Sequence, residues 1–164
     1  DLYAGYKNEI LEKLTFDLSI IYYWYPSDSR TPEKDYVEVH TGLGYALAKI
    51  PLQPALGVAF NYSPDFYGED GDAYSVSGTL RLTLPYEFGL AFELAYQFVE
   101  GNKSTGNGAG LDRENGYDYM YWRIGISKEL LGFNLEMSYY DTNESEYFGK
   151  IGDDRIVVAI CRSF

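Results

Sequence analysis

The sequence predicts an all-β protein, an antiparallel transmembrane β-barrel with meander topology. Three observations predict it. Apolar and polar residues alternate with period two along most of the chain, and helical periodicity is nearly absent. Most alternating segments run 11 to 14 residues, whereas soluble strands average about 5–6 residues and a tilted bilayer-crossing strand needs about 9–11. Aromatic residues make up 18% of the chain, and aromatic girdles flank the lipid-facing band of such barrels.

Nine segments show the alternation and are bounded by Gly, Pro, Asn and Asp. In the clearest one, "FGLAFELAYQFV", large apolar residues from Phe88 to Phe98 alternate with small or polar residues. The nine segments span residues 1–7, 13–25, 35–48, 53–63, 73–85, 87–99, 116–129, 132–142 and 153–164.

The connections between these segments alternate in length. The short ones are "NEILE", "KIPLQ", "PYE" and "LLGF", and the long ones cover residues 26–35, 63–72, 100–115 and 141–154. The long connections carry formal charges of −1, −4, −1 and −4 in chain order, which makes −10 of the net −12. Short turns at one end and long loops at the other are typical of bacterial outer-membrane barrels. Aromatic residues gather at both strand ends, as two girdles would require.

The composition of the chain argues against several other classes of protein. A net charge of −12 argues against a nucleic-acid partner. Cys161 is the only cysteine, so no internal disulfide forms, and we interpret it as a small filler. No apolar run approaches the ~20 residues of a membrane-spanning helix. The chain starts without a basic and apolar leader, so we expect a signal peptide to have been removed or not included.

Nine is an odd number, whereas single-chain bacterial barrels have an even number of strands. We therefore expect residues 1–164 to be a single outer-membrane β-barrel domain that is incomplete at its N-terminus. The alternative is that residues 1–7 are not a strand and that an eight-stranded barrel closes on residues 13–25.

If the apolar residues of each alternating segment face lipid, the residues between them face the lumen. Charges there can pair or line water, whereas on the lipid face each would cost a few kcal/mol. The functional interpretation is a polar pore, and the competing one is an interior plugged by salt bridges. The pore-lining candidates are Asp17, Glu38, His40, Arg81, Glu93, Gln97, Arg123, Glu136 and Arg155.

No catalytic or cofactor-binding residues are expected. The only histidine is His40, no G-x-S-x-G motif occurs, and no Ser can be paired with His40 from the sequence. The chain has no phosphate loop and no zinc spacing, so we expect no cofactor and no metal. Asp65, Glu69, Asp70 and Asp72 do not match a calcium loop and predict a solvated acidic loop.

The last strand is expected to run to Phe164, with Arg162 snorkelling at the periplasmic rim. An aromatic C-terminal residue on such a strand resembles the signal read by the barrel assembly machinery. The expected partners are therefore that machinery, outer-membrane lipid, lipopolysaccharide and small polar solutes.

Several stretches together resemble one known family. "DLYAGYKNEI", "LTFDLSIIYYWYPS", "YVEVHTGLGY", "YSPDFYGEDGDAYSVSGTL", "WRIGISKELLGFNLEMSYYDTN" and "DDRIVVAICRSF" resemble, in this order, the TorF-type porins of proteobacterial outer membranes. The resemblance implies about three further strands before residue 1 and a barrel of about twelve. It also implies a location in the bacterial outer membrane.

The expected function is passive diffusion of small hydrophilic solutes through an outer-membrane porin-like channel. One alternative is a plugged structural or surface-interaction barrel whose acidic extracellular loops meet a partner. A lipid-modifying outer-membrane enzyme is a lesser alternative, as is a soluble Tyr-rich binding barrel.

Overall fold

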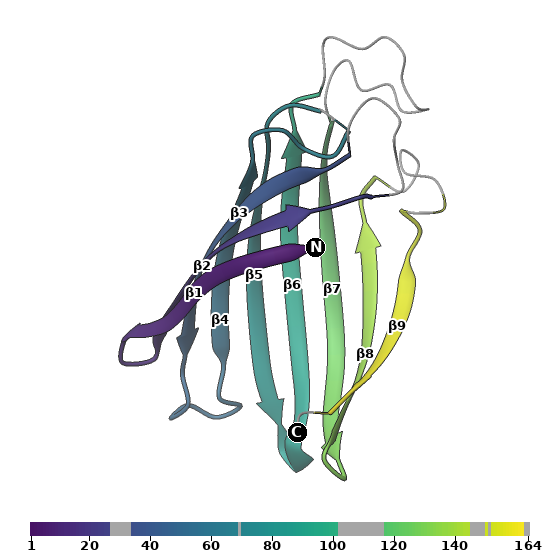
Figure 1. The fold of residues 1–164 in the computed structure, drawn as a ribbon. Helices are drawn as coiled ribbons and strands as arrows, with labels where there is room; N and C mark the ends of the chain where they lie inside the picture. The colour runs from purple at the N-terminus through teal and green to yellow at the C-terminus, as the bar shows by residue number, and fades with distance from the viewer. Residues whose placement is uncertain (27–33, 69, 102–116, 145–149, 151, 163–164) are drawn as a thin grey trace.

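The computed structural model describes residues 1–26, 34–68, 70–101, 117–144, 150 and 152–162 of the chain. These residues form one antiparallel sheet of nine strands, each paired with the next along the chain (Figure 1). The all-β meander predicted from the sequence is confirmed. The strands are β1 (Leu2–Leu11), β2 (Leu14–Tyr23), β3 (Tyr36–Ala46), β4 (Ala55–Ser63), β5 (Ala73–Leu84), β6 (Phe88–Val99), β7 (Tyr117–Leu130), β8 (Phe133–Thr142) and β9 (Arg155–Cys161).

The first strand is longer than the sequence predicts. Of the predicted connection 8–12, residues 8–11 belong to β1, because Asn8 pairs with Phe16 and Glu9 with Thr15, and the turn is confined to Glu12 and Lys13. The eight-strand alternative is also wrong, since β1 pairs with β2 along its length. The prediction failed because the register shifts between Glu9 and Leu11, which interrupts the alternation just before the hairpin turn.

The short turns share a backbone feature that suits tight hairpins. In the turn between β7 and β8, Leu131 has φ 56° and Gly132 has φ 77°. Positive φ at both central residues is what a two-residue hairpin needs to match the right-handed twist of its strands. Lys13 in the first hairpin has φ 70°, and a 3-10 turn, η1 (Pro85–Glu87), joins β5 to β6. These turns define the short-turn end of the sheet.

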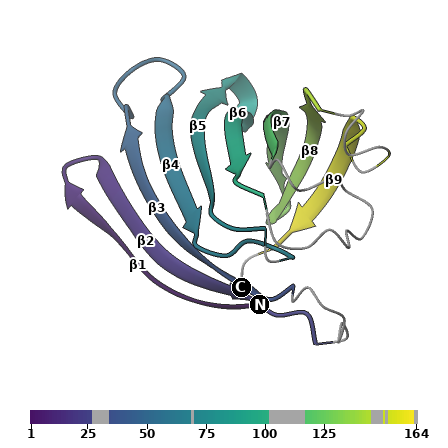
Figure 2. The same cartoon turned by 90° about the horizontal axis from the view of Figure 1, so that it is seen from above.

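The sheet curls like an incomplete cylinder when it is seen along its strands (Figure 2). It is not closed, because β1 and β9 are its two edges. The long connections all join strands at the opposite end from the short turns, as the meander topology requires. Within the described part of the chain, no helix is long and apolar enough to cross a membrane.

The last strand is shorter than predicted. β9 ends at Cys161 rather than continuing to the end of the chain. Arg162 follows it, with its guanidinium 5.1 Å from the centre of the Phe133 ring. Phe164 lies outside the described residues, so its proposed recognition by the assembly machinery stays a prediction.

The register gives the sheet two chemically distinct faces. One face carries the odd-numbered residues of β1, β2, β4–β7 and β9 and the even-numbered residues of β3 and β8. Its small side chains are the buried ones: Ala73, Ala95 and Ser138 are each 2% exposed. A curved sheet crowds side chains on its inner side, so we call this the concave face. The opposite side is called the apolar face.

Candidate functional site

The apolar face is exposed and lacks charge over most of its height. Val58 is 59% exposed, Leu94 57% and Val158 69%. In β7 the first and last charged residues of this face are Asp118 and Lys128, and the residues of this face between them are uncharged. On β8 the uncharged stretch ends at Asp141, which lies opposite Trp122. Ten residues span about 33 Å along a strand. At the usual tilt this projects to about 25 Å, the height of the apolar band of outer-membrane barrels.

A repeated contact marks the upper limit of the apolar face, at the end of the long connections. The hydroxyl of Tyr22 donates to Asp35 at 2.9 Å, that of Tyr62 to Asp72 at 3.2 Å, that of Tyr96 to Asp118 at 2.8 Å and that of Tyr139 to Asp141 at 3.3 Å. Each long connection thus has one outward Tyr–Asp pair beside it. The phenol ring suits a boundary between apolar and aqueous surroundings.

The lower limit has the opposite charge. The Lys128 ammonium lies 5.0 Å from the centre of the Phe88 ring, and Arg162 lies over Phe133. Long cationic side chains over aromatic rings are suited to snorkel from an apolar layer toward water. The snorkelling of Arg162 at a periplasmic rim stays a prediction.

The girdle prediction needs a correction. Several tyrosines near the long connections lie on the concave face instead of the apolar face, namely Tyr23, Tyr36, Tyr119, Tyr121 and Tyr140. Tyr23 and Tyr36 stack there with ring centres 4.4 Å apart, and Tyr36 also packs against Phe66 at 5.0 Å. The aromatic residues at this end therefore form an outward belt and an inward cluster.

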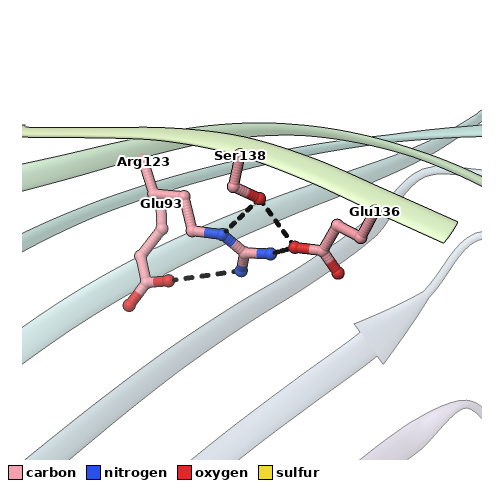
Figure 3. A network of polar contacts seen from close by, with 4 residues as sticks. All are labelled: Glu93, Arg123, Glu136 and Ser138. Atoms are coloured by element: carbon pink, nitrogen blue, oxygen red, sulfur yellow. Dashed lines mark hydrogen bonds and ion pairs between the residues drawn. The ribbon is translucent and has the colours of Figure 1, made fainter. Parts of the chain in front are cut away.

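A polar network occupies the concave face of β6, β7 and β8 (Figure 3). The Arg123 guanidinium donates to Glu136, which also accepts a hydrogen bond from Ser138 Oγ at 2.6 Å. Arg123 Nε donates to Ser138 Oγ at 3.1 Å, and its Nη1 lies 3.9 Å from Glu93. Gly125 makes room for the network, because a Cβ there would lie 2.5 Å from Ser138 Oγ. In this half of the face, one cation is neutralised by two carboxylates.

A hydrogen-bonded chain crosses β3, β4 and β5 on the same face. His40 Nδ1 lies 2.6 Å from Asn61 Oδ1, and Asn61 Nδ2 donates to Ser75 Oγ at 2.9 Å. The Asn61 amide therefore positions the His40 ring, and the Ser75 hydroxyl in turn positions that amide.

A hollow of about 330 Å³ lies on the concave face between β1 and β5, toward the short-turn end. Its floor is made of residues with little or no side chain, including Gly42, Gly44, Gly57 and Ala59. Its charged lining residues are Lys7, Lys13, Asp17 and Arg81, with His40 beside them. Lys7 and Asp17 form an ion pair at 3.0 Å.

All nine predicted lining residues lie on the concave face. Three of them, Glu93, Arg123 and Glu136, meet in one network, and Asp17, His40 and Arg81 line one hollow. The others are not part of this network or of the lining of this hollow: Glu38 is half-buried on β3 beside His40, Gln97 donates to the Phe98 carbonyl at 3.4 Å, and Arg155 donates to the Lys150 carbonyl at 2.7 Å.

Sequence reasoning missed Lys7 and Lys13 as lining residues. Lys7 shares the parity of Tyr3 and Gly5 in β1, so the alternation of this strand was a usable signal. Alternation could not identify Lys13 as a lining residue, because Lys13 lies in the turn between β1 and β2.

The acidic connection between β4 and β5 is partly folded inward. Asp65 and Asp72 are exposed, but Asp70 is only 1% exposed, and its backbone N–H donates to the Phe66 carbonyl at 3.2 Å. The prediction of a wholly solvated acidic loop is therefore wrong for Asp70, while Glu69 lies outside the described residues. Among the described residues, no three His, Cys, Asp or Glu side chains gather as a metal site.

The comparison with protein families covers the whole chain. Residues 1–164 match the model of a family described as "Bacterial protein of unknown function (Gcw_chp)". The chain belongs to the Gcw_chp family. No curated protein and no solved structure matches it. The description of Gcw_chp proteins assigns them no activity, so the resemblance to TorF-type porins stays a prediction.

Proposed function

We propose that this chain forms most of the wall of a bacterial outer-membrane β-barrel, and that the barrel is a passive channel for small hydrophilic solutes. The observation that carries the proposal is the division of the sheet into an exposed, charge-free apolar face and a concave face of small and polar residues. In water such an apolar face would be unfavourable, at about 25 cal/mol per Å² of apolar surface. In a bilayer it is the expected lipid-facing surface.

The strand directions indicate how the wall closes. β1 and β9 both run from the long-connection end to the short-turn end, so pairing them with each other would be parallel. An antiparallel barrel therefore needs an odd number of further strands from polypeptide outside residues 1–164. The three strands implied by the TorF-type resemblance meet this condition and give twelve. A second copy inserted in the same orientation does not, because its edges run the same way.

The size of the barrel supports an open channel rather than an interior filled by side chains. Barrels of about eight strands have room only for side chains, and larger ones enclose cavities or channels. Small residues such as Gly57 and Ala59 on the concave face leave space rather than filling it. A nine-stranded wall with further strands thus exceeds the size at which side chains alone occupy the interior.

The second candidate function is a plugged barrel that acts through its acidic long connections. The network of Arg123 with Glu93 and Glu136 favours it, because paired charges across a lumen can fill it. The network covers three adjacent strands of one half of the face, however, and the hollow at β1–β5 lies outside it. For this reason the channel is our first proposal.

The experiment that tests the proposal is single-channel recording of the complete, folded protein in planar lipid bilayers. We expect stable, ohmic steps that scale with salt concentration. Heat-modifiable migration in detergent serves as the control for folding. A silent bilayer from protein shown to be folded and inserted would overturn the channel and favour the plugged barrel.

A further inference from the structure

The hollow at β1–β5 has a charge balance opposite to that of the protein. Its lining contains three cationic side chains, Lys7, Lys13 and Arg81, and one carboxylate, Asp17. The whole chain has 13 Lys and Arg against 25 Asp and Glu. A net positive hollow in a chain of net charge −12 indicates a site that favours anions.

The neighbouring carboxylates compensate only part of this positive charge. The Glu9 carboxylate accepts a hydrogen bond from the Lys13 backbone N–H at 2.9 Å. Asp17 is already paired with Lys7 at 3.0 Å. Glu12 lies 3.8 Å from Lys13, but its side chain is 83% exposed, so this pair is screened by water. In the part of the chain that the structure describes, no ion pair joins Arg81 to an acidic side chain.

The contrast with Arg123 is informative, because both arginines lie on the concave face. Arg123 has Glu93 and Glu136 beside it and Ser138 as a further partner. Arg81 instead lines the hollow together with Ser77 and Thr79 of the same strand, beside glycine and alanine of β3 and β4. Hydroxyl groups and an unpaired guanidinium are suitable partners for carboxylate or phosphate oxygens.

From these observations we propose that the hollow is an anion site on the solute path, and that the channel favours small anions bearing carboxylate or phosphate groups. The inference rests on the proposed channel function. About 330 Å³ is at the lower end of small-ligand sites. The hollow therefore fits a small organic anion or a partly hydrated inorganic one.

The first test is the reversal potential of the reconstituted protein in a KCl gradient. We expect the wild type to prefer chloride over potassium. Arg81→Glu should lower the anion-to-cation permeability ratio about three- to ten-fold, because it reverses one charge inside a confined path. Lys49→Glu is the matched control: it makes the same charge change at the same end of the sheet, but Lys49 is exposed and does not line the hollow.

The second test measures binding without conductance. Calorimetric titration of the folded protein in detergent with citrate should give a signal that the double variant Lys13→Gln/Arg81→Gln loses and Lys49→Gln retains. If Arg81→Glu does not fold, these neutral variants replace it in the measurement of reversal potential.

The outcomes separate the two proposals. Channels that prefer potassium, or that respond equally to Arg81→Glu and Lys49→Glu, would overturn the anion site and leave the channel standing. Silent bilayers with citrate binding that depends on Arg81 would overturn the channel and support the anion site. Absence of citrate binding together with silent bilayers would overturn both.

Discussion

The hydroxyl of Tyr96 in β6 donates a hydrogen bond to the carboxylate of Asp118 in β7, across 2.8 Å at the outer limit of the apolar face. The same relationship occurs beside each of the other long connections, in the pairs Tyr22–Asp35, Tyr62–Asp72 and Tyr139–Asp141. In Tyr22–Asp35, Tyr62–Asp72 and Tyr96–Asp118 the contact crosses a hairpin, whereas Tyr139 and Asp141 lie two residues apart in β8. In the barrel proposed above, this repeated contact would mark the boundary between hydrocarbon and water.

Removing the hydroxyl of Tyr96 should weaken the sheet at this boundary. We expect Tyr96→Phe to lower the thermal midpoint of the folded protein in lipid vesicles by about 1–3 °C, because one hydrogen bond to a carboxylate is lost while the ring remains. The quadruple variant that also changes Tyr22, Tyr62 and Tyr139 should show a roughly additive decrease, since the pairs are far apart.

Tyr74→Phe is the control for this prediction. Tyr74 also faces outward near the same level, but its contact is a ring stack on Phe98 with centres 4.8 Å apart, which the substitution preserves. Its midpoint should stay at the wild-type value. Equal decreases for Tyr74→Phe and Tyr96→Phe would remove the special role of the Tyr–Asp pairs.

A charge at the middle of the apolar face should oppose membrane insertion. Leu80 faces outward near the middle of β5, opposite Leu56 and Phe92. In a bilayer, Leu80→Arg should destabilise the folded protein by about 2–4 kcal/mol, because the guanidinium would lie near the hydrocarbon midplane. Urea unfolding in vesicles, followed by tryptophan fluorescence, measures this difference.

Thr79→Arg is the matched control, because Thr79 is the preceding residue and lies on the concave face beside the hollow. It should fold and insert with a much smaller loss of stability. If the apolar face were exposed to water, Leu80→Arg would cost only about 0.5 kcal/mol, as ordinary surface substitutions do. That result would argue against the barrel.

The sequence was sufficient to predict the order of the strands. Alternation in segments such as 73–85 and 87–99 is nearly uninterrupted, so both their number and their limits agree with β5 and β6 within a few residues. The error at residues 8–12 came from the irregular register near Glu9, where alternation no longer reports pairing. Period-two patterns identify strands well only while the ladder is regular.

The sequence was less informative about the candidate site. The alternation of residues along each strand placed Arg81 and Arg123 on the same face. It could not show that only Arg123 forms ion pairs with carboxylates in the described part of the chain. That difference depends on register: Glu93 lies directly opposite Arg123, whereas Arg81 pairs with Ala55 and Ala91. Register depends on turn lengths and on irregular pairing near the turns, which the alternation of residues within a strand does not reveal.

Removing the cation of the concave network should destabilise the protein. In Arg123→Met, Glu93 and Glu136 would face each other on a partly buried surface without their shared partner. Since the three side chains retain 19–29% exposure, we expect a loss of about 2 kcal/mol rather than the larger cost of a fully buried pair. Urea unfolding in vesicles again provides the measurement.

The triple variant Glu93→Gln/Arg123→Met/Glu136→Gln tests the cause of this loss. It removes the two carboxylates together with the cation, so it should recover most of the stability. If the triple variant were no more stable than Arg123→Met, packing of the Arg123 side chain rather than charge pairing would explain the effect.

The last prediction uses the single thiol to distinguish the two faces. Cys161 is free, exposed and on the concave face of β9, whereas Val158 faces outward within the apolar face and is 69% exposed. In a barrel with an aqueous lumen, a charged methanethiosulfonate reagent should modify Cys161 in vesicles and reduce conductance. The Val158→Cys/Cys161→Ser variant should resist this reagent, because its thiol would lie in hydrocarbon, which the charged reagent does not enter and where a thiolate hardly forms. Equal modification of both thiols by the charged reagent would mean that both faces meet water, which a barrel wall does not allow.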